Sequence, residues 1–159
     1  MLVEALEKAG DRPHLRGGLL RALGMLAANR ADTLDVLAKY MHDEHWYVRS
    51  CVARGLASAL FKHPHAAGPL GELLRDGDLF VRERAAQGMR GAARAAEGQQ
   101  VICAALGDGD PLVRALAARA VHGGVDEEAS LLADVEAALA RESHPGARRE
   151  LRKAILRLR

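Results

Sequence analysis

The feature that most constrains this chain is a segment that recurs about every 33 residues. Three clear copies read DEHWYVRSCVARGLASAL, DGDLFVRERAAQGMRGA and DGDPLVRALAARAVHGG, and two weaker copies flank them. All five align on an apolar residue followed by arginine, and these anchors are 33, 33, 32 and 34 residues apart. A period of this length indicates a solenoid, in which one supersecondary unit is repeated and stacked. The anchors are Leu15-Arg16, Val48-Arg49, Val81-Arg82, Val113-Arg114 and Ala147-Arg148.

Equivalent positions in the five copies carry similar residues. The positions four and eight after the anchor are apolar, and together with the anchor they form a stripe of helical period. The position seven after the anchor is always small, which lets a neighbouring helix approach closely. We expect these columns to become rows of neighbours in the interior. The three columns are Leu19, Val52, Ala85, Ala117 and Leu151 (four after), Ala22, Gly55, Gly88, Ala120 and Ala154 (seven after), and Leu23, Leu56, Met89, Val121 and Ile155 (eight after).

The helix boundaries follow from the residues around each anchor. Proline stands two before the anchor in three copies, and it suits the first helical position because its missing N–H would have no partner there. Asp78 and Asp110 precede this position and are good N-caps. The second helices should therefore start at Pro13, Trp46, Leu79, Pro111 and Pro145, and the first helices are expected at 2–9, 33–41, 69–76, 98–107 and 127–141.

These patterns predict the architecture. No strand-like alternation is present, so the chain is predicted to be all-α, an α-solenoid of about five antiparallel helical hairpins. One hairpin cannot bury its apolar face alone, so the stacking of neighbours supplies the core. We expect one domain over residues 1–159. The starting methionine and the basic final helix favour a complete small protein.

Composition excludes several classes of protein. No apolar run approaches the roughly 20 residues of a membrane span, and the start lacks the order of a signal peptide, so we place the chain in the cytoplasm. Aromatic residues make up only 3%, which argues against a cofactor box built from rings. The two cysteines, Cys51 and Cys103, have no metal-binding spacing. We interpret them as reduced, buried small hydrophobes.

The corner between the two helices carries a family resemblance. A hairpin of this length, with aspartate in the corner and Val-Arg opening the second helix, resembles HEAT repeats, particularly the HEAT-like units of bilin-lyase type. The likeness covers nearly the whole chain and is strongest between 43 and 121; Gly10 and Glu142 occupy the corner position at the two ends. The resemblance implies a ladder of ion pairs between successive repeats. Its members would be Asp43, Asp76 and Asp108 with Arg49, Arg82 and Arg114.

A second basic column stands six after the anchor, where Gln87 interrupts four cations. It is five residues from the ladder arginines, about 140° around a helix, so the two columns cannot share a face. In solenoids of this kind the second helices usually line the concave side. We therefore expect a basic concave surface there, while the first helices are more acidic. The cations of the column are Arg21, Arg54, Arg119 and Lys153.

Catalytic and metal-binding patterns are not visible. His42 and His45 lie in a corner, and His63 and His65 flank a proline in a loop, so none has the spacing of a metal site. A surface or capping role is the better interpretation. The sequence shows no nucleophile elbow, no phosphate-binding glycine loop and no paired Cys/His site. We expect no enzymatic activity, no cofactor, no metal and no small-molecule substrate.

Two functions fit a charged solenoid. The first is a non-catalytic scaffold or adaptor that binds another protein, for example through an acidic segment, with Trp46 and Tyr47 as aromatic contacts. All five aromatic side chains lie between 40 and 80, and a local core cluster is the alternative explanation, above all for Tyr40 and Phe61.

The second function is nucleic-acid binding, in which the basic column would contact phosphates. The segment HWYVRSCVARGLASAL also resembles DNA alkylation-repeat proteins, which bind a duplex on a basic concave face. For glycosylase activity of that kind, Trp46 with Asp43 or Glu44 would be the nearby candidates. The chain is short for that class of enzyme.

Overall fold

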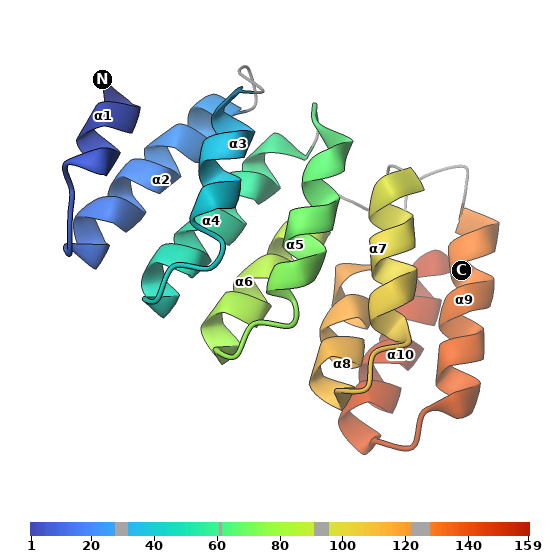
Figure 1. Cartoon of the computed structure of the whole chain (residues 1–159). Coiled ribbons are helices and arrows are strands. Elements are labelled where there is room, and N and C mark those ends of the chain that lie inside the picture. Colours follow the sequence, from blue (N-terminus) through green and yellow to red (C-terminus); the bar gives the residue numbers. More distant parts are fainter. Residues whose placement is uncertain (28–31, 61, 91–95, 122–127) are drawn as a thin grey trace.

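The computed structural model describes residues 1–27, 32–60, 62–90, 96–121 and 128–159, apart from the side chains of 128–130, and within these ranges it contains helices and no strands. In this described part of the chain, ten α-helices form five antiparallel hairpins that lie side by side from one end to the other (Figure 1). The first helices are α1 (Leu2–Glu7), α3 (Asp32–Lys39), α5 (Ala67–Leu73), α7 (Ala96–Leu106) and α9 (Glu128–Arg141). The second helices are α2 (Pro13–Ala27), α4 (Trp46–Ala59), α6 (Leu79–Met89), α8 (Pro111–Ala120) and α10 (Pro145–Leu158).

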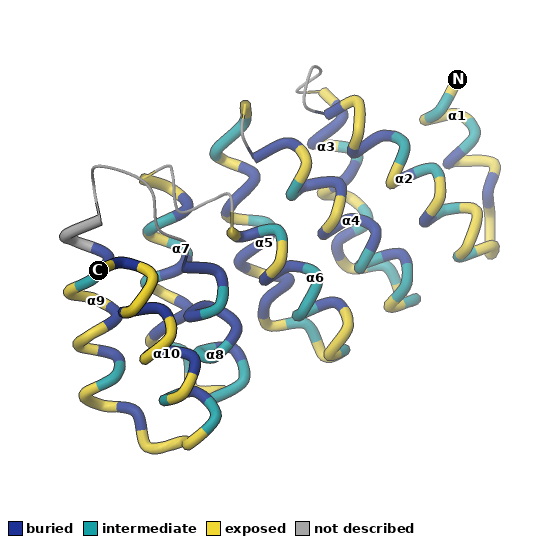
Figure 2. The backbone as a smooth tube through the Cα atoms, turned by 180° about the vertical axis from the view of Figure 1, so that it is seen from behind, coloured by how far each residue is buried: buried dark blue, intermediate teal, exposed yellow. Residues whose placement is uncertain are grey.

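The predicted fold is confirmed, including the start of every second helix. The second helices pack in chain order, α2 on α4, α4 on α6, α6 on α8 and α8 on α10. In the other layer α5 packs on α7 and α7 on α9, after a turn of 3-10 helix, η1 (Pro64–Ala66), that leads into α5. Figure 2 shows the layer of second helices from behind, with the buried stretches of each helix turned towards its neighbours.

The predicted apolar columns form the interior. Val52, Ala85, Ala117 and Leu151 are at most 1% exposed, and the whole column eight after the anchor is buried. Leu19 is the exception, since it is only partly buried. It belongs to α2, the first helix of its layer, and within the described residues no second helix packs on that side.

The small column sets how closely the second helices approach. A Cβ atom added to Gly24 would lie 2.2 Å from Cα of Gly55, and one added to Gly88 would lie 2.6 Å from Cβ of Ala57. At these two junctions position seven of one helix therefore packs against position nine of the preceding one. At the next junction position nine is Arg90, and α6 packs less extensively on α8 than on α4.

Some corners are held by an arginine that reaches in two directions. In the second hairpin Arg49 donates through Nη1 to the carbonyl oxygens of Asp43 (2.7 Å) and Glu44 (3.1 Å) of its own corner. Its Nε and Nη2 donate to both carboxylate oxygens of Asp76 in the next corner (2.6 and 2.9 Å). The Asp76 carboxylate also accepts the backbone N–H of Asp78 at 2.8 Å. One side chain therefore closes a corner and ties it to its neighbour.

The implied ladder is correct at some junctions and wrong at one. Arg49 pairs with Asp76 as expected, while Arg114 pairs with Glu142, the residue that replaces aspartate in the last corner. Arg16 extends the ladder at the other end by donating to Asp43 at 3.0 Å.

Arg82 does not join the ladder. Asp108 instead accepts Arg75, which follows α5 in the layer of first helices. Arg82 donates only to carbonyl oxygens of its own corner, and its buried Nε has no partner among the described residues. The departure occurs at the junction between α6 and α8, where Arg90 takes the place of a small residue.

The N-caps confirm the expected helix starts and give two histidines a role. Asp78 and Asp110 accept the backbone N–H groups of Phe80 and Leu112, each at 2.8 Å. His45 caps α4 by accepting the N–H of Tyr47 on Nδ1 at 3.2 Å. His144 caps α10 in the same manner. The capping interpretation is therefore confirmed for His45.

Candidate functional site

The outward side of the second helices carries two parallel rows of residues, which we call the outer face. The rows stand one before and six after the anchor. A separation of seven residues corresponds to about 10 Å along a helix and about 20° around it, so both rows point the same way. The first row contains His14, Tyr47, Phe80, Leu112 and Gly146, and the second contains Arg21, Arg54, Gln87, Arg119 and Lys153.

The predicted basic column does point outward. Arg21, Arg54 and Lys153 are exposed and Arg119 is partly exposed. Lys153 lies 3.0 Å from a carboxylate oxygen of Glu150, and Arg119 lies 4.0 Å from Glu83. The guanidinium groups of Arg21 and Arg54 make no hydrogen bond or ion pair with any other described residue, although the Arg54 carbonyl accepts the Ser58 hydroxyl at 3.1 Å. The N-terminal half of the column therefore presents two unpaired cations to solvent.

Aromatic rings form a continuous chain across the first three hairpins. The ring centroids of His14 and Tyr47 are 5.0 Å apart, those of Tyr47 and Trp46 are 5.9 Å apart, and those of Trp46 and Phe80 are 5.6 Å apart. Trp46 is 41% and Phe80 65% exposed. Exposed rings in contact with one another are typical anchors of interfaces. This chain of rings, which adds Trp46 to three residues of the first row, thus joins α2, α4 and α6 at their N-terminal ends.

The core-cluster explanation accounts for Tyr47, which packs against the core, but not for Trp46 and Phe80. Tyr40 is partly buried and packs against the core, as that explanation expects, and Phe61 lies outside the described residues. Trp46 and Phe80 are instead exposed on the surface. Phe80 was not among the predicted contact residues, although its position one before an anchor, shared with Tyr47, is a signal that could have identified it.

A glycine on the neighbouring helix makes room for Tyr47. A Cβ atom on Gly17 would lie 2.5 Å from Cε1 of the tyrosine ring. Because Gly17 has no side chain, the ring rests directly on α2. The half-buried Tyr47 is therefore held in place, while the adjacent Trp46 remains exposed at the end of the helix.

The C-terminal part of the outer face is hollowed into a cleft of about 460 Å³ between α8 and α10. Leu112 and Ala115 supply apolar walls, and Arg119, Arg149 and Lys153 supply cations. The sequence pattern did not predict this cleft, because its lining combines different columns from two helices.

An internal carboxylate balances part of this charge. Burial acts to raise the pKa of Glu150, but hydrogen bonds from Lys153 and Arg149 outweigh it and lower that pKa. Glu150 therefore stays ionised and pairs with Arg149 and Lys153. These two cations are less available to bind anions than Arg21 and Arg54.

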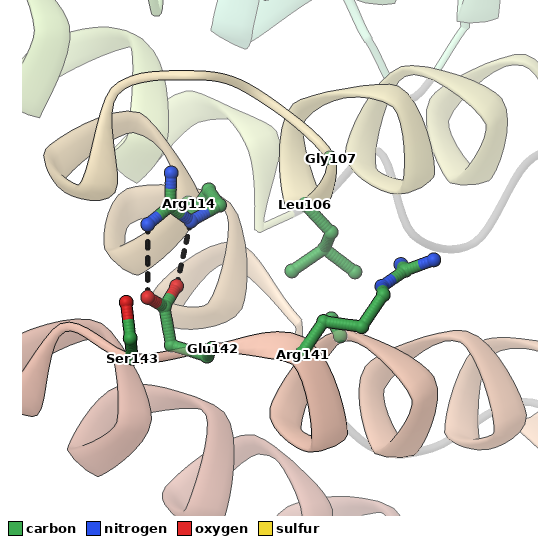
Figure 3. A pocket seen from close by; sticks show the side chains of 7 residues that line it. Leu106, Gly107, Arg114, Arg141, Glu142 and Ser143 are labelled. Carbon is green, nitrogen blue, oxygen red and sulfur yellow. Dashed lines mark hydrogen bonds and ion pairs between the residues drawn. The ribbon is translucent and has the colours of Figure 1, made fainter.

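A second cleft, of about 380 Å³, lies where the corner after α7 meets the end of α9 (Figure 3). Two of its polar groups are paired with each other, because Arg114 donates to both oxygens of Glu142 at 2.6 and 2.8 Å. These hydrogen bonds, against the effect of burial, lower the pKa of Glu142 to about 2. The cleft is a corner of the ladder, and its paired groups serve the stacking of hairpins.

The remaining candidates occupy structural positions. Cys51 is buried, as predicted, but Cys103 is only partly buried, and its Sγ lies 3.0 Å from Oδ2 of Asp134. The Asp43 carboxylate already accepts two hydrogen bonds in its corner, one from the Arg16 side chain and one from the backbone N–H of His45. Within the described residues no three side chains of metal-binding type come together, and no helix is long and apolar enough to cross a membrane.

Stacked antiparallel hairpins tied by a ladder of arginines define an α-solenoid. The chain belongs to the HEAT repeat family, whose model matches residues 1–90. No curated protein matches it significantly.

Three of the similar solved structures are designed or engineered proteins. A designed armadillo repeat protein in complex with the peptide (KR)4 is 18% identical, with a TM-score of 0.57 over 99% of this chain and 80% of that one. A structure of computationally designed armadillo repeat proteins for modular peptide recognition is 18% identical, with a TM-score of 0.55 over 96% of this chain and 79% of that one. A further engineered protein is 16% identical, with a TM-score of 0.50 over 99% of this chain and 96% of that one. At these identities the likeness shows the fold alone.

Proposed function

We propose that this protein is a protein-binding scaffold, a single domain over residues 1–159, whose outer face receives an extended acidic segment of a partner. The observation that carries the proposal is the alignment of an aromatic row and a basic row on one side of the second helices. Trp46 and Phe80 would receive apolar side chains, while Arg21 and Arg54 would pair with carboxylates. The proposal assigns no chemistry to the outer face beyond binding.

The geometry suits a peptide that runs across the helices. Packed helices lie about 8–10 Å apart, so the basic row offers one cation for about every three residues of an extended chain. Gln87 interrupts the row in the third hairpin, where the exposed ring of Phe80 lies. A fitting partner therefore carries carboxylates three residues apart, followed by an apolar residue.

The structural neighbours add a limited argument. A designed solenoid of this fold was solved in complex with the peptide (KR)4. A solenoid of this kind can therefore bind a peptide, and the cations on the present outer face favour a peptide of opposite charge.

A binding experiment with matched controls tests the proposal. The probe is a fluorescein-labelled peptide with acidic residues three apart and a central leucine, and its anisotropy is followed at low and moderate salt. The double variant R21S/R54S should weaken binding at least about tenfold, since each lost charge pair is worth about 1 kcal/mol or more. W46A/F80A should weaken it similarly.

The control removes the same charge from other parts of the molecule. The double variant K8S/K39S replaces two exposed lysines outside the outer face, and it should leave the affinity within about twofold. Equal weakening by R21S/R54S and K8S/K39S would show that the peptide responds only to net charge. That result, or no binding by the unmodified protein, would overturn the proposal.

Nucleic acid is the alternative ligand, because the same cations would contact phosphates. Against a glycosylase site beside Trp46, the Asp43 carboxylate is already engaged by Arg16. A labelled DNA duplex provides the comparison. Tighter binding of DNA than of the acidic peptide at the same salt, abolished in R21S/R54S, would replace the protein partner by nucleic acid.

A further inference from the structure

The cleft between α8 and α10 lies at a place that a tyrosine fills between α2 and α4. There the ring of Tyr47 rests on Gly17, since a Cβ atom on this glycine would lie 2.5 Å from Cε1 of the ring. Tyr47 stands one before the anchor of α4, and Gly17 stands two after the anchor of α2. The residues at the same two positions of α10 and α8 are Gly146 and Ala115. Both of them line the cleft.

The cleft is therefore open because the repeat has no side chain at this point. In α4, α6 and α8 the position one before the anchor carries Tyr47, Phe80 and Leu112, whereas α10 carries Gly146. A Cβ atom placed on Gly146 would meet only the ring of His144 within 4 Å among the described residues. No described atom of α8 comes that close to it, so the space between the two helices is not filled from within.

The size and the apolar wall of the cleft suit a ring. Its volume of about 460 Å³ lies in the usual range of ligand-binding cavities, about 300–1,000 Å³. One wall is apolar and comes from the start of α8, where Pro111, Leu112 and Ala115 line it. Burying an apolar side chain against this wall would remove the wall and the side chain from water together.

The cations of the cleft favour an aromatic ring over an aliphatic side chain. Arg119 lines the cleft from α8, and Arg149 and Lys153 line it from α10. A cation is attracted to the face of a ring, and a planar guanidinium can stack there while its N–H groups donate in its own plane. The contact of Arg149 with Glu150, at 3.3 Å, therefore leaves the face of the guanidinium able to stack.

We propose that the cleft receives an aromatic side chain of the partner, in the place that Tyr47 fills between α2 and α4. The inference rests on the proposed function, because the ring belongs to the same acidic segment that crosses the outer face. The cleft is continuous with that face, since Leu112 and Gly146 belong to its first row and Arg119 and Lys153 to its second. The segment thus has a second anchor, and the ring distinguishes it from other acidic peptides.

The position of this ring in the partner follows from the spacing of the helices. Helices α6, α8 and α10 pack in that order, about 8–10 Å apart, so the cleft lies about one and a half such steps from α6. An extended chain covers this distance in about four residues, and every second side chain points to the same face. The aromatic residue should therefore stand about four residues beyond the apolar residue that contacts Phe80.

Peptides of two lengths separate this inference from the proposed function. The short peptide is the acidic probe with a central leucine, and it reports on the acidic segment alone. The long peptide adds a phenylalanine four residues beyond that leucine. It should bind at least about tenfold more tightly than the same long peptide with alanine in place of phenylalanine, because a ring is buried. Cyclohexylalanine, which resembles the ring in size but has no π electrons, should give a smaller gain.

Filling the cleft from within should abolish the gain. G146Y supplies a ring at the position equivalent to Tyr47, so the phenylalanine and alanine peptides should bind alike, and the affinity for the short peptide should stay within about twofold. G68Y is the matched control, because Gly68 is exposed on α5 with open space around it, and this variant should keep the gain. Circular dichroism verifies that the variants fold. A115F fills the cleft from the opposite wall and replaces G146Y if the new side chain disturbs the cap formed by His144.

Several results would overturn the inference and leave the proposed function standing. In each of them the short peptide binds. The phenylalanine of the long peptide then adds no affinity, or its gain persists in both G146Y and A115F, or cyclohexylalanine gives an equal gain, which would indicate an aliphatic ligand. Failure of both the short and the long peptide to bind would instead overturn the proposed function and this inference together.

Discussion

Arg75 donates through Nε to Oδ2 of Asp108 and ties the third hairpin to the fourth through the layer of first helices. At the junctions made by Arg16, Arg49 and Arg114, the corresponding arginine belongs to a second helix. The exchange coincides with the less extensive packing of α6 on α8. The arginines at equivalent positions of the repeats should therefore contribute unequally to the free energy of unfolding, and this difference can be measured.

Arg49 should contribute more stability than Arg82. R49M removes a bidentate ion pair and leaves the Asp76 side chain, only 8% exposed, without its partner, so we expect a loss of about 2–4 kcal/mol. R82M removes hydrogen bonds to backbone carbonyls alone and should cost about 1 kcal/mol. Urea unfolding of the two variants gives the comparison. Equal losses would contradict the assignment of the ladder.

Stability should fall in acid because of Glu142. Its folded-state pKa of about 2 lies below the ordinary value of 4.5, so its ion pair stabilises the fold fully above pH 4.5 and is lost as the pH falls through about 2. E142Q should therefore unfold at lower temperature than the unmodified protein at pH 7, with a smaller difference near pH 3. E72Q, at an exposed glutamate, is the control. A difference in melting temperature that does not change with pH would refute this prediction.

Two glycines of α2 should respond in opposite ways to alanine. A Cβ atom at position 24 would overlap the backbone of Gly55, so G24A should destabilise the protein by about 1–3 kcal/mol. Gly18 is exposed with open space around it, so G18A should stabilise α2 by about 0.5–1 kcal/mol through helix propensity. Thermal unfolding measures both changes. Destabilisation by G18A would show that its surroundings are more crowded than the structure indicates.

Cys103 should react slowly with thiol reagents. Burial first, and then the contact with Asp134, raise its pKa to about 12, so little thiolate is present at neutral pH. D134N should speed the reaction with iodoacetamide by about tenfold or more at pH 8, because it removes the negative charge. Cys51 is buried, and its rate should be the same in both proteins. Mass spectrometry of each modified site reports the rates, and equal rates at Cys103 would exclude the role of Asp134.

Much of the architecture was predictable, because the repeat makes each hairpin a copy of its neighbours. Proline or a capping aspartate marks most second helices, and Val52 or Ala85 could be assigned to the interior from its column alone. The outward direction of Arg21 and Arg54 followed from helical geometry. The partial exposure of Leu19 was not predicted, because this residue occupies a core column but no described second helix covers it.

The sequence by itself determined the helices, their order and the face that each residue takes, because these depend on local period, caps and turns. Only the tertiary structure decided which side chains meet across hairpins: that Asp108 accepts Arg75, that Trp46 touches Phe80, and that α8 and α10 leave a cleft. The physical reason is that a repeat specifies neighbours only while the stacking is uniform. At the junction of α6 and α8, where Arg90 stands in place of a small residue, the helices pack less extensively and Asp108 pairs with Arg75 in place of Arg82.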